Sequence, residues 1–337
     1  MKSKLLLTTV LTLPCSAALA QSSVNIYGVL DAFTGRVATA NAPQKTNVVN
    51  SGGLITSYYG FGGSEQLGGS LKAQFNLEGF YRIDTGEAGR FNNEAMFARS
   101  ANVGMAGDFG LVRMGRVVNP LFLALGQINP FGPSTRLSPV INQMFTPFGG
   151  NATYGDTGWS NSIAYTSPTV HDTTVALQYS LGETPGQHNN NWAAVAKYVG
   201  TALSLTLGAQ DVEFGTGIAA TGPRQHSYLA AAAYDFKAVK LFASYSQHDT
   251  DISNRGGKIL HAGFTVPTFQ GIGRWMVAYS RLDEEATGKP DFHRDTAAIG
   301  YDHNVSPRTD LYSVLMRDKL SNGGHGNSLV AGIRHRY

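Results

Sequence analysis

Polar and apolar side chains alternate one for one along most of this chain. Residues 71–78 give the clearest example, because every odd position there is apolar and every even position is polar or charged. The same pattern recurs over residues 175–180, 201–210 and 239–247. A period of two is that of a β-strand with one apolar face. The sequence therefore predicts an all-β chain.

The connections between the predicted strands fall into two length classes. Short turns are predicted at 65–69, 106–110, 167–172, 199–201, 235–238, 266–271 and 303–308, and long polar segments at 35–53, 84–94, 119–161, 181–191, 211–226, 248–256, 281–294 and 317–326. A soluble β-sandwich would share the alternation, but short turns on one side and long loops on the other are typical of transmembrane barrels. The strands also run to about ten residues, which a tilted membrane strand requires.

Seven short and eight long connections join sixteen strands, so the expected fold is a sixteen-stranded antiparallel transmembrane β-barrel. An even number of strands can close, which removes the edges that lipid could not satisfy. At that strand number the lumen is too wide for side chains to fill, and it should hold water. A wide wet barrel conducts small polar solutes unless something plugs it.

Composition supports the same class. Charged residues make up 15% of the chain, against the usual quarter, and there are 40 glycines. No stretch of eighteen apolar residues occurs, so helical membrane spans are not expected. The tyrosines and other aromatic residues near predicted strand ends should include members of interfacial girdles; the candidates are Tyr27, Tyr59, Phe61, Tyr165, Tyr198, Tyr228, Tyr245, Tyr279, Tyr301 and Tyr312.

The first twenty residues have the pattern of a secretory signal peptide. Lys2 and Lys4 form a basic start, residues 5–13 are mostly apolar, and residues 18–20 form a small-x-small cleavage site. We expect residues 1–20 to be removed and residues 21–337 to form the barrel domain. Cys15, the only cysteine, follows Pro14, which argues against a lipoprotein signal. Loss of the two lysines lowers the net charge from +3 to +1, so nucleic-acid binding is not implied.

Several segments, taken in order, resemble the general porins of β-proteobacteria. The resemblance lies in residues 23–31 (SVNIYGVLD), 63–75 (GSEQLGGSLKAQF), 97–105, 107–110, 115–116, 161–168 and 331–337 (AGIRHRY). It implies a homotrimer of sixteen-stranded barrels, each narrowed by a third loop folded into the pore. The last strand ends in Tyr337, which resembles the terminal signal that outer-membrane barrels present to their insertion machinery.

The candidate third loop, residues 119–161, is the longest gap between predicted strands. A gap of that length is usually functional. Its many prolines and glycines predict a stiff, turn-filled path, and its charged residues are Arg136 and Asp156. Members of the resembled family often place acidic residues on this loop opposite arginines on the wall. Here the loop has only one acidic residue, Asp156.

Four arginines are candidates for the pore wall. Alternation places Arg82 and Arg113 on the lumen face. Arg99 shares the parity of apolar positions in the strand that follows; a bulge at Gly104 would turn it inward, as the resemblance favours. Otherwise it must lie above the hydrocarbon, because a lipid-facing arginine at mid-depth costs roughly 2–4 kcal/mol. Arg116, near a strand end, lines the pore or serves a subunit contact.

The sequence departs from the resembled family at the pore. That family usually carries arginine at the places of Tyr58 and Ala164, both of which point inward by alternation. The remaining arginines and the shortage of loop acids predict a mild anion preference, since charge rings set selectivity in a wet pore. The constriction candidates are Arg82, Arg99, Arg113, Arg116, Tyr58, Arg136 and Asp156.

Other functions fit less well. A substrate-selective channel shares all these features. A barrel enzyme needs grouped catalytic residues, yet the histidines are scattered and no nucleophile motif accompanies them. An adhesin or purely structural barrel would not conduct. The acidic segment 283–295 lacks the spacing of a calcium loop, so no metal or other cofactor is expected. Beyond the trimer and the insertion machinery, the expected partners are outer-membrane lipid, lipopolysaccharide and small hydrophilic solutes.

Overall fold

The computed structural model describes residues 23–40, 42–145, 156–183, 190–213, 224–251, 255–285 and 291–337. The expected signal peptide, residues 1–20, lies outside these ranges and stays a prediction. Within them the strands are β1 (Ser23–Val37), β2 (Thr46–Ser51), β3 (Tyr58–Gly68), β4 (Leu71–Phe80), β5 (Ser100–Gly107), β6 (Gly110–Val118), β7 (Gly158–Thr166), β8 (Thr173–Ser180), β9 (Asn191–Val199), β10 (Leu203–Val212), β11 (Gln225–Asp235), β12 (Lys240–Thr250), β13 (Arg255–Pro267), β14 (Gly273–Glu285), β15 (Phe292–Ser306), β16 (Thr309–Leu320) and β17 (His325–Arg336).

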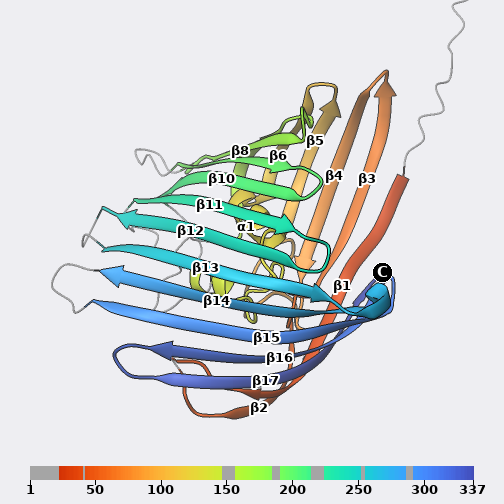
Figure 1. Ribbon diagram of the computed structural model, residues 1–337. Helices are drawn as coiled ribbons and strands as arrows, with labels where there is room; N and C mark the ends of the chain where they lie inside the picture. The colour runs from red at the N-terminus through yellow and green to blue at the C-terminus, as the bar shows by residue number, and fades with distance from the viewer. Residues whose placement is uncertain are drawn as a thin grey trace, which may run out of the picture.

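All these strands form one antiparallel sheet that closes on itself (Figure 1). β1 pairs with β17 on one edge and with β3 on the other. β2 pairs with the same edge of β1 as β3 does, further along the strand. β2 and β3 therefore occupy one position in the wall, and the seventeen strands make the sixteen positions expected from the sequence.

The alternation separates two faces of the wall. Large apolar side chains such as Val103, Leu207, Leu260 and Leu315 are exposed on one face, which we call the outer belt. The alternate positions, such as Asn102, Thr206, Ile259 and Met316, are buried. Because the sheet is closed, the face opposite the outer belt is the inside of the barrel. The exposed apolar side chains of the outer belt are stable only in contact with lipid.

Most of the predicted connections agree with the observed ones. The seven short turns all lie where they were expected, and one of them contains the 3₁₀ turn η1 (Phe269–Gly271). Three predicted long loops, 248–256, 281–294 and 317–326, extend into strands and are wrong in their bounds. β12 and β13 are separated by residues 251–254, β14 and β15 by residues 286–291, and β16 and β17 by residues 321–324. The loops are shorter than expected because polar residues continue the strand pairing beyond the apolar segment.

The third loop contains two short helices, α1 (Pro120–Gln127) and α2 (Pro139–Phe145). The expected turn-filled path therefore also contains helices, which were not predicted from the sequence. Asn119 caps α1 by accepting hydrogen bonds from the backbone N–H groups of Leu121 and Phe122, with Pro120 in the first turn. Proline is favoured at that position because its missing N–H would have no partner there. Neither helix is long and apolar enough to cross a bilayer.

Both helices pack against the inner face of the wall. Leu121 and Leu125 of α1 and Ile141 of α2 share one buried cluster with Val195 and Ile259 from the strands. α1 contacts β8, β9 and β10, and α2 contacts β13, β14 and β15. Figure 1 shows α1 on the inner side of the wall, and its contacts place it against β8 to β10. The two helices thus lie against the wall at two places, β8 to β10 and β13 to β15.

Two of the aromatic candidates for the interfacial girdles point inward instead. Tyr27 donates a hydrogen bond to Glu78, and Tyr312 is buried and donates one to Asp31. By contrast, Tyr228, Tyr245 and Tyr279 of the same set are exposed on the outer face. Parity along each strand, rather than nearness to its end, separates the two groups.

Candidate functional site: the inner wall beside the third loop

Arg99 lies against the inner wall immediately before β5. Its guanidinium forms an ion pair with Glu78 and stands 4.1 Å from the ring centroid of Tyr58. The pairing of β4 with β5 and of β5 with β6 runs without a register shift through Gly104. The bulge considered there does not occur. Arg99 lies outside the alternation of β5, because it precedes Ser100, the first residue of that strand. Its backbone N–H donates to the Glu78 carbonyl, and its side chain faces inward.

Asp156, at the end of the third loop, is shared by two arginines. Its Oδ1 accepts from Arg90 at 3.1 Å, and its Oδ2 accepts from Arg116 at 2.6 Å. Arg90 also pairs with Glu94 at 2.5 Å. Burial alone would lower the pKa of the Arg90 guanidinium, but Asp156 and Glu94 outweigh it and raise that pKa. The loop's single acid is therefore neutralised where it lies.

Sequence reasoning missed Arg90, because its loop position carries no strand parity.

Arg116 faces a different way from the other arginines. It lies on the side of β6 that carries the exposed Met114, and it donates to Ser160 Oγ at 3.0 Å and to the Ala98 carbonyl. Its pore-lining role stays a prediction, and the alternative of a subunit contact stays open.

Arg82 and Arg136 line one cavity between the third loop and the loop after β4. Arg82 pairs with Glu87 at 3.0 Å and donates to Asn92 at 2.8 Å. Arg136 donates to the amide oxygen of Asn50 at 3.5 Å and lies 6.0 Å from the ring centroid of Phe33. It has no ion-pair partner among the described residues. Burial lowers the pKa of Arg136 and nearby carboxylates act the other way, but an arginine stays charged at neutral pH.

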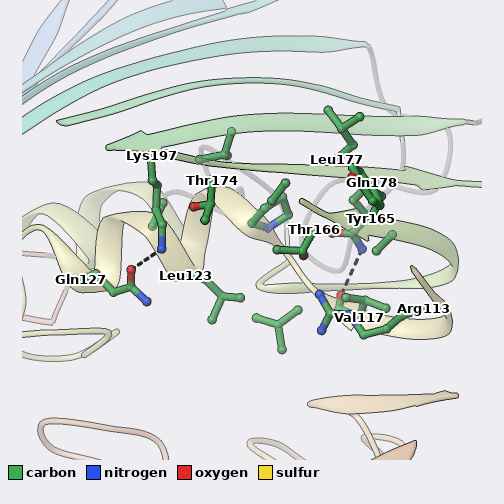
Figure 2. Close-up of a pocket in the computed structure, with 16 residues that line it drawn as sticks. Arg113, Val117, Leu123, Gln127, Tyr165, Thr166, Thr174, Leu177, Gln178 and Lys197 are labelled. Atoms are coloured by element: carbon green, nitrogen blue, oxygen red, sulfur yellow. Dashed lines mark hydrogen bonds between the residues drawn. The ribbon is translucent and has the colours of Figure 1, made fainter. Parts of the chain in front are cut away.

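Arg113 lies on the inner face of β6, as alternation predicted, opposite Ala164 on β7. With Lys197 of β9 it lines a hollow between α1 and strands β6 to β9 (Figure 2). Lys197 donates to the side-chain oxygen of Gln127 on α1 at 2.7 Å. Neither cation has an ion-pair partner within the part of the chain that the structure describes. Figure 2 shows both bonds that tie this region together, Lys197 to Gln127 and Gln178 to the Val117 carbonyl.

A buried carboxylate holds the third loop to the wall. Asp31 of β1 is fully buried and accepts hydrogen bonds from the backbone N–H groups of Gly53, Leu54 and Ile55 at 2.9–3.0 Å, and from the Tyr312 hydroxyl at 2.5 Å. These bonds fold the break between β2 and β3 inward. Ser134 of the third loop then donates to the Gly53 carbonyl at 2.5 Å.

Further polar bonds fix the third loop at other points. Asn119 donates to Gln210 on β10 at 2.9 Å, and Gln143 donates to Thr296 on β15 at 2.9 Å. Arg294 bridges Asn142 of α2 and Asp318 of β16, each at 2.8 Å. The loop is thus tied to strands on both sides of the barrel, which gives the wall residues beside it a fixed geometry.

Metal chemistry finds no support in the described ranges, where no group of three His, Cys, Asp or Glu side chains could hold an ion. In the acidic segment 283–295, Asp283 pairs with Arg281 at 2.9 Å and Asp295 accepts from the Tyr279 hydroxyl at 2.5 Å. Residues 286–290 of that segment lie outside the described residues.

Comparison with protein families matches residues 7–323 to the model described as Gram-negative porin. Outer membrane porin protein 32 of Delftia acidovorans is 29% identical over 326 residues, covering 94% of this chain and 89% of that protein. An outer membrane porin protein of Bordetella pertussis is 25% identical over 399 residues, and the match covers 100% of both chains.

Solved structures show the same fold. The anion-selective porin from Comamonas acidovorans matches with a TM-score of 0.79 at 24% identity, covering 94% of this chain and 100% of that one. The trimer form of OmpT from Vibrio cholerae matches with a TM-score of 0.68 at 13% identity, covering 94% and 99%. At these identities the structural matches speak for the barrel alone.

Proposed function

The chain belongs to the Gram-negative porin family, and we propose that small hydrophilic solutes and ions diffuse passively through its pore with a mild preference for anions. It is an outer-membrane channel, as its curated relatives are outer membrane porins. We further propose that the third loop narrows the pore, because α1 and α2 pack on the inner face of the wall.

The observation that carries the anion preference is the pairing of charge beside the third loop. Glu78, Glu87 and Asp156 are each bound to arginines. Arg113, Arg136 and Lys197, by contrast, have no ion-pair partner among the described residues. A few unpaired cations predict a mild preference for anions.

The paired arginines contribute less to this field than the sequence suggested. Arg82 and Arg99 each hold a carboxylate, so we assign the main role to Arg113 and Arg136. The anion-selective porin from Comamonas acidovorans has the same fold, which is consistent with this assignment but does not supply its residues.

The test is the reversal potential of purified protein in a planar bilayer under a KCl gradient. We expect the reversal potential to have the sign of the chloride equilibrium potential. Arg113→Gln should lower the anion-to-cation permeability ratio about two- to fivefold, since one unit charge at about 4 Å is worth ~1 kcal/mol in water. Arg317→Gln is the matched control, because Arg317 is exposed on the outer face. A clear cation preference of the wild type would refute the proposal.

Assembly and partners follow from family membership. We propose a homotrimer, contact with outer-membrane lipid and lipopolysaccharide, and recognition of Tyr337 by the barrel-insertion machinery. Cross-linking of the protein in outer-membrane vesicles tests the trimer, and a dimer or monomer as the largest species would contradict it. Deletion of Tyr337 should lower the amount of folded barrel in the membrane.

The alternatives separate by simple measurements. A substrate-selective channel would show saturating flux of one solute against its close analogues, whereas a general pore would not. Members of the porin family are channels, and we infer that this chain has no catalytic activity. An adhesin or structural barrel would insert without conducting.

A further inference from the structure

The hollow between α1 and strands β6 to β9 combines positive charge with apolar walls. We propose that it binds organic anions that have an apolar body, with aromatic carboxylates as the best-fitting class. The inference rests on the proposed function, because it names the kind of anion that the channel retains on its way through.

The charge of the hollow is not offset by its lining. Arg113 enters from β6, and its Nε is buried without a hydrogen-bond partner. Lys197 enters from β9, and its ammonium donates to the neutral amide of Gln127. No carboxylate lines the hollow within the described residues. Two cations in a recess with low-dielectric walls attract an anion more strongly than the same charges on open surface.

The walls of the hollow are apolar. Leu123 of α1, Ala164 of β7 and Val195 of β9 contribute to the lining. Leu123 is 39% exposed, although the neighbouring residues of its helix, Leu121 and Leu125, are buried. Figure 2 shows Leu123 beside the hollow together with Lys197 and Arg113. A solute with an apolar body would cover this leucine, which an inorganic anion cannot do.

Gln178 holds the wall of the hollow in place. It is buried, with 3% of its surface exposed, and its Nε2 donates to the Val117 carbonyl at 3.1 Å and to Ser162 Oγ at 3.0 Å. These two bonds tie β8 to β6 and β7 beside Arg113. The lining is therefore fixed before a solute arrives.

The hollow lies on the short-turn side of the third loop. Lys197 is two residues before the end of β9, and Thr166 and Thr174, which also line the hollow, are at the turn between β7 and β8. Short turns of such barrels face the periplasm. A solute that has passed the third loop from outside would therefore meet the hollow before release.

Block of single-channel current tests the proposal, with benzoate as the probe added to the short-turn side. Acetate is the anion without an apolar body, and benzyl alcohol is the aromatic solute without a charge. The half-blocking concentration of benzoate should be about tenfold below that of acetate, since burial of part of a phenyl ring is worth about 1.4 kcal/mol. Benzyl alcohol should not block at the same concentrations.

Two variants and a matched control localise the site. Lys197→Gln should raise the half-blocking concentration of benzoate about five- to tenfold, and Leu123→Ala about threefold without changing the effect of acetate. Lys72→Gln is the control, because Lys72 is also an inward lysine near a short turn but does not line the hollow. It should leave the benzoate block unchanged.

Two outcomes would overturn the proposal. One is block by benzoate no stronger than block by acetate. The other is an equal loss of benzoate block in Lys72→Gln and Lys197→Gln, which would assign the effect to the general field of the pore. Either result leaves the reversal potential in KCl, and hence the proposed function, as a separate measurement on the same protein.

Discussion

Asp31→Asn is the sharpest perturbation that the structure offers, because one carboxylate holds four donors. Oδ1 accepts from Gly53 N–H and the Tyr312 hydroxyl, and Oδ2 accepts from Leu54 and Ile55 N–H. An asparagine of the same shape keeps one acceptor oxygen and replaces the other with an NH₂ group. That group would face two donors, which leaves two buried bonds unmade.

The magnitude follows from those two bonds. A hydrogen bond to a charged acceptor contributes about 1.5–3 kcal/mol net. Loss of two, with partial relaxation of the residues between β2 and β3, should lower the free energy of unfolding by about 3 kcal/mol. Tyr312→Phe is the graded control, because it removes one of the four bonds and should cost about 1.5 kcal/mol.

These differences in the free energy of unfolding can be measured by urea unfolding of the barrel in detergent. The folded fraction is read from gels, on which folded and unfolded protein migrate differently. Because Ser134 of the third loop is bonded to Gly53, Asp31→Asn should also increase current noise in single channels. Asp31→Asn as stable and as quiet as the wild type would refute the anchoring role. So would a larger loss in Tyr312→Phe than in Asp31→Asn.

Three further predictions test other parts of the account. Asp156→Asn leaves Arg90 and Arg116 without their shared carboxylate. It should raise the anion-to-cation permeability ratio about twofold, and a lower ratio would contradict the prediction. Asn119→Ala removes the cap of α1 and should cost about 1 kcal/mol in urea unfolding, where an unchanged midpoint would count against the cap. Leu207→Arg places a charge on the outer belt, costing about 2–4 kcal/mol, so the yield of folded barrel should drop; normal yield would contradict the assigned facing.

The strands and short turns could be predicted because a half-buried strand is written directly into alternate residues. The inward facing of Arg113 and Tyr58 followed from the same rule. The break between β2 and β3 could not be found in this way. It depends on hydrogen bonds from residues 53–55 to Asp31, which lies in a different strand.

The helices of the third loop were missed for a different reason. Proline and glycine in such number indicate turns, whereas Pro120 and Pro139 each open a helix. The available signal was the residue before each proline, Asn119 and Ser138, since a short polar side chain followed by proline is typical of a helix N-terminus.

The charge pairing at the site lay beyond sequence reasoning. Arg99 reaches Glu78 from outside the paired part of β5, and Arg90 meets Asp156 from a loop 66 residues away. Such contacts depend on how loops cross the barrel wall, and no local pattern encodes them. Parity located the wall residues, but the structure was needed to tell paired cations from unpaired ones.

Single-channel recording of the purified protein in a planar bilayer under a salt gradient tests the central claim most directly. The account predicts stepwise openings in groups of three. It also predicts a reversal potential that has the sign of the chloride equilibrium potential. Folded, inserted protein that does not conduct would contradict the open channel. Openings with a reversal potential that has the sign of the potassium equilibrium potential would contradict the anion-preferring wall.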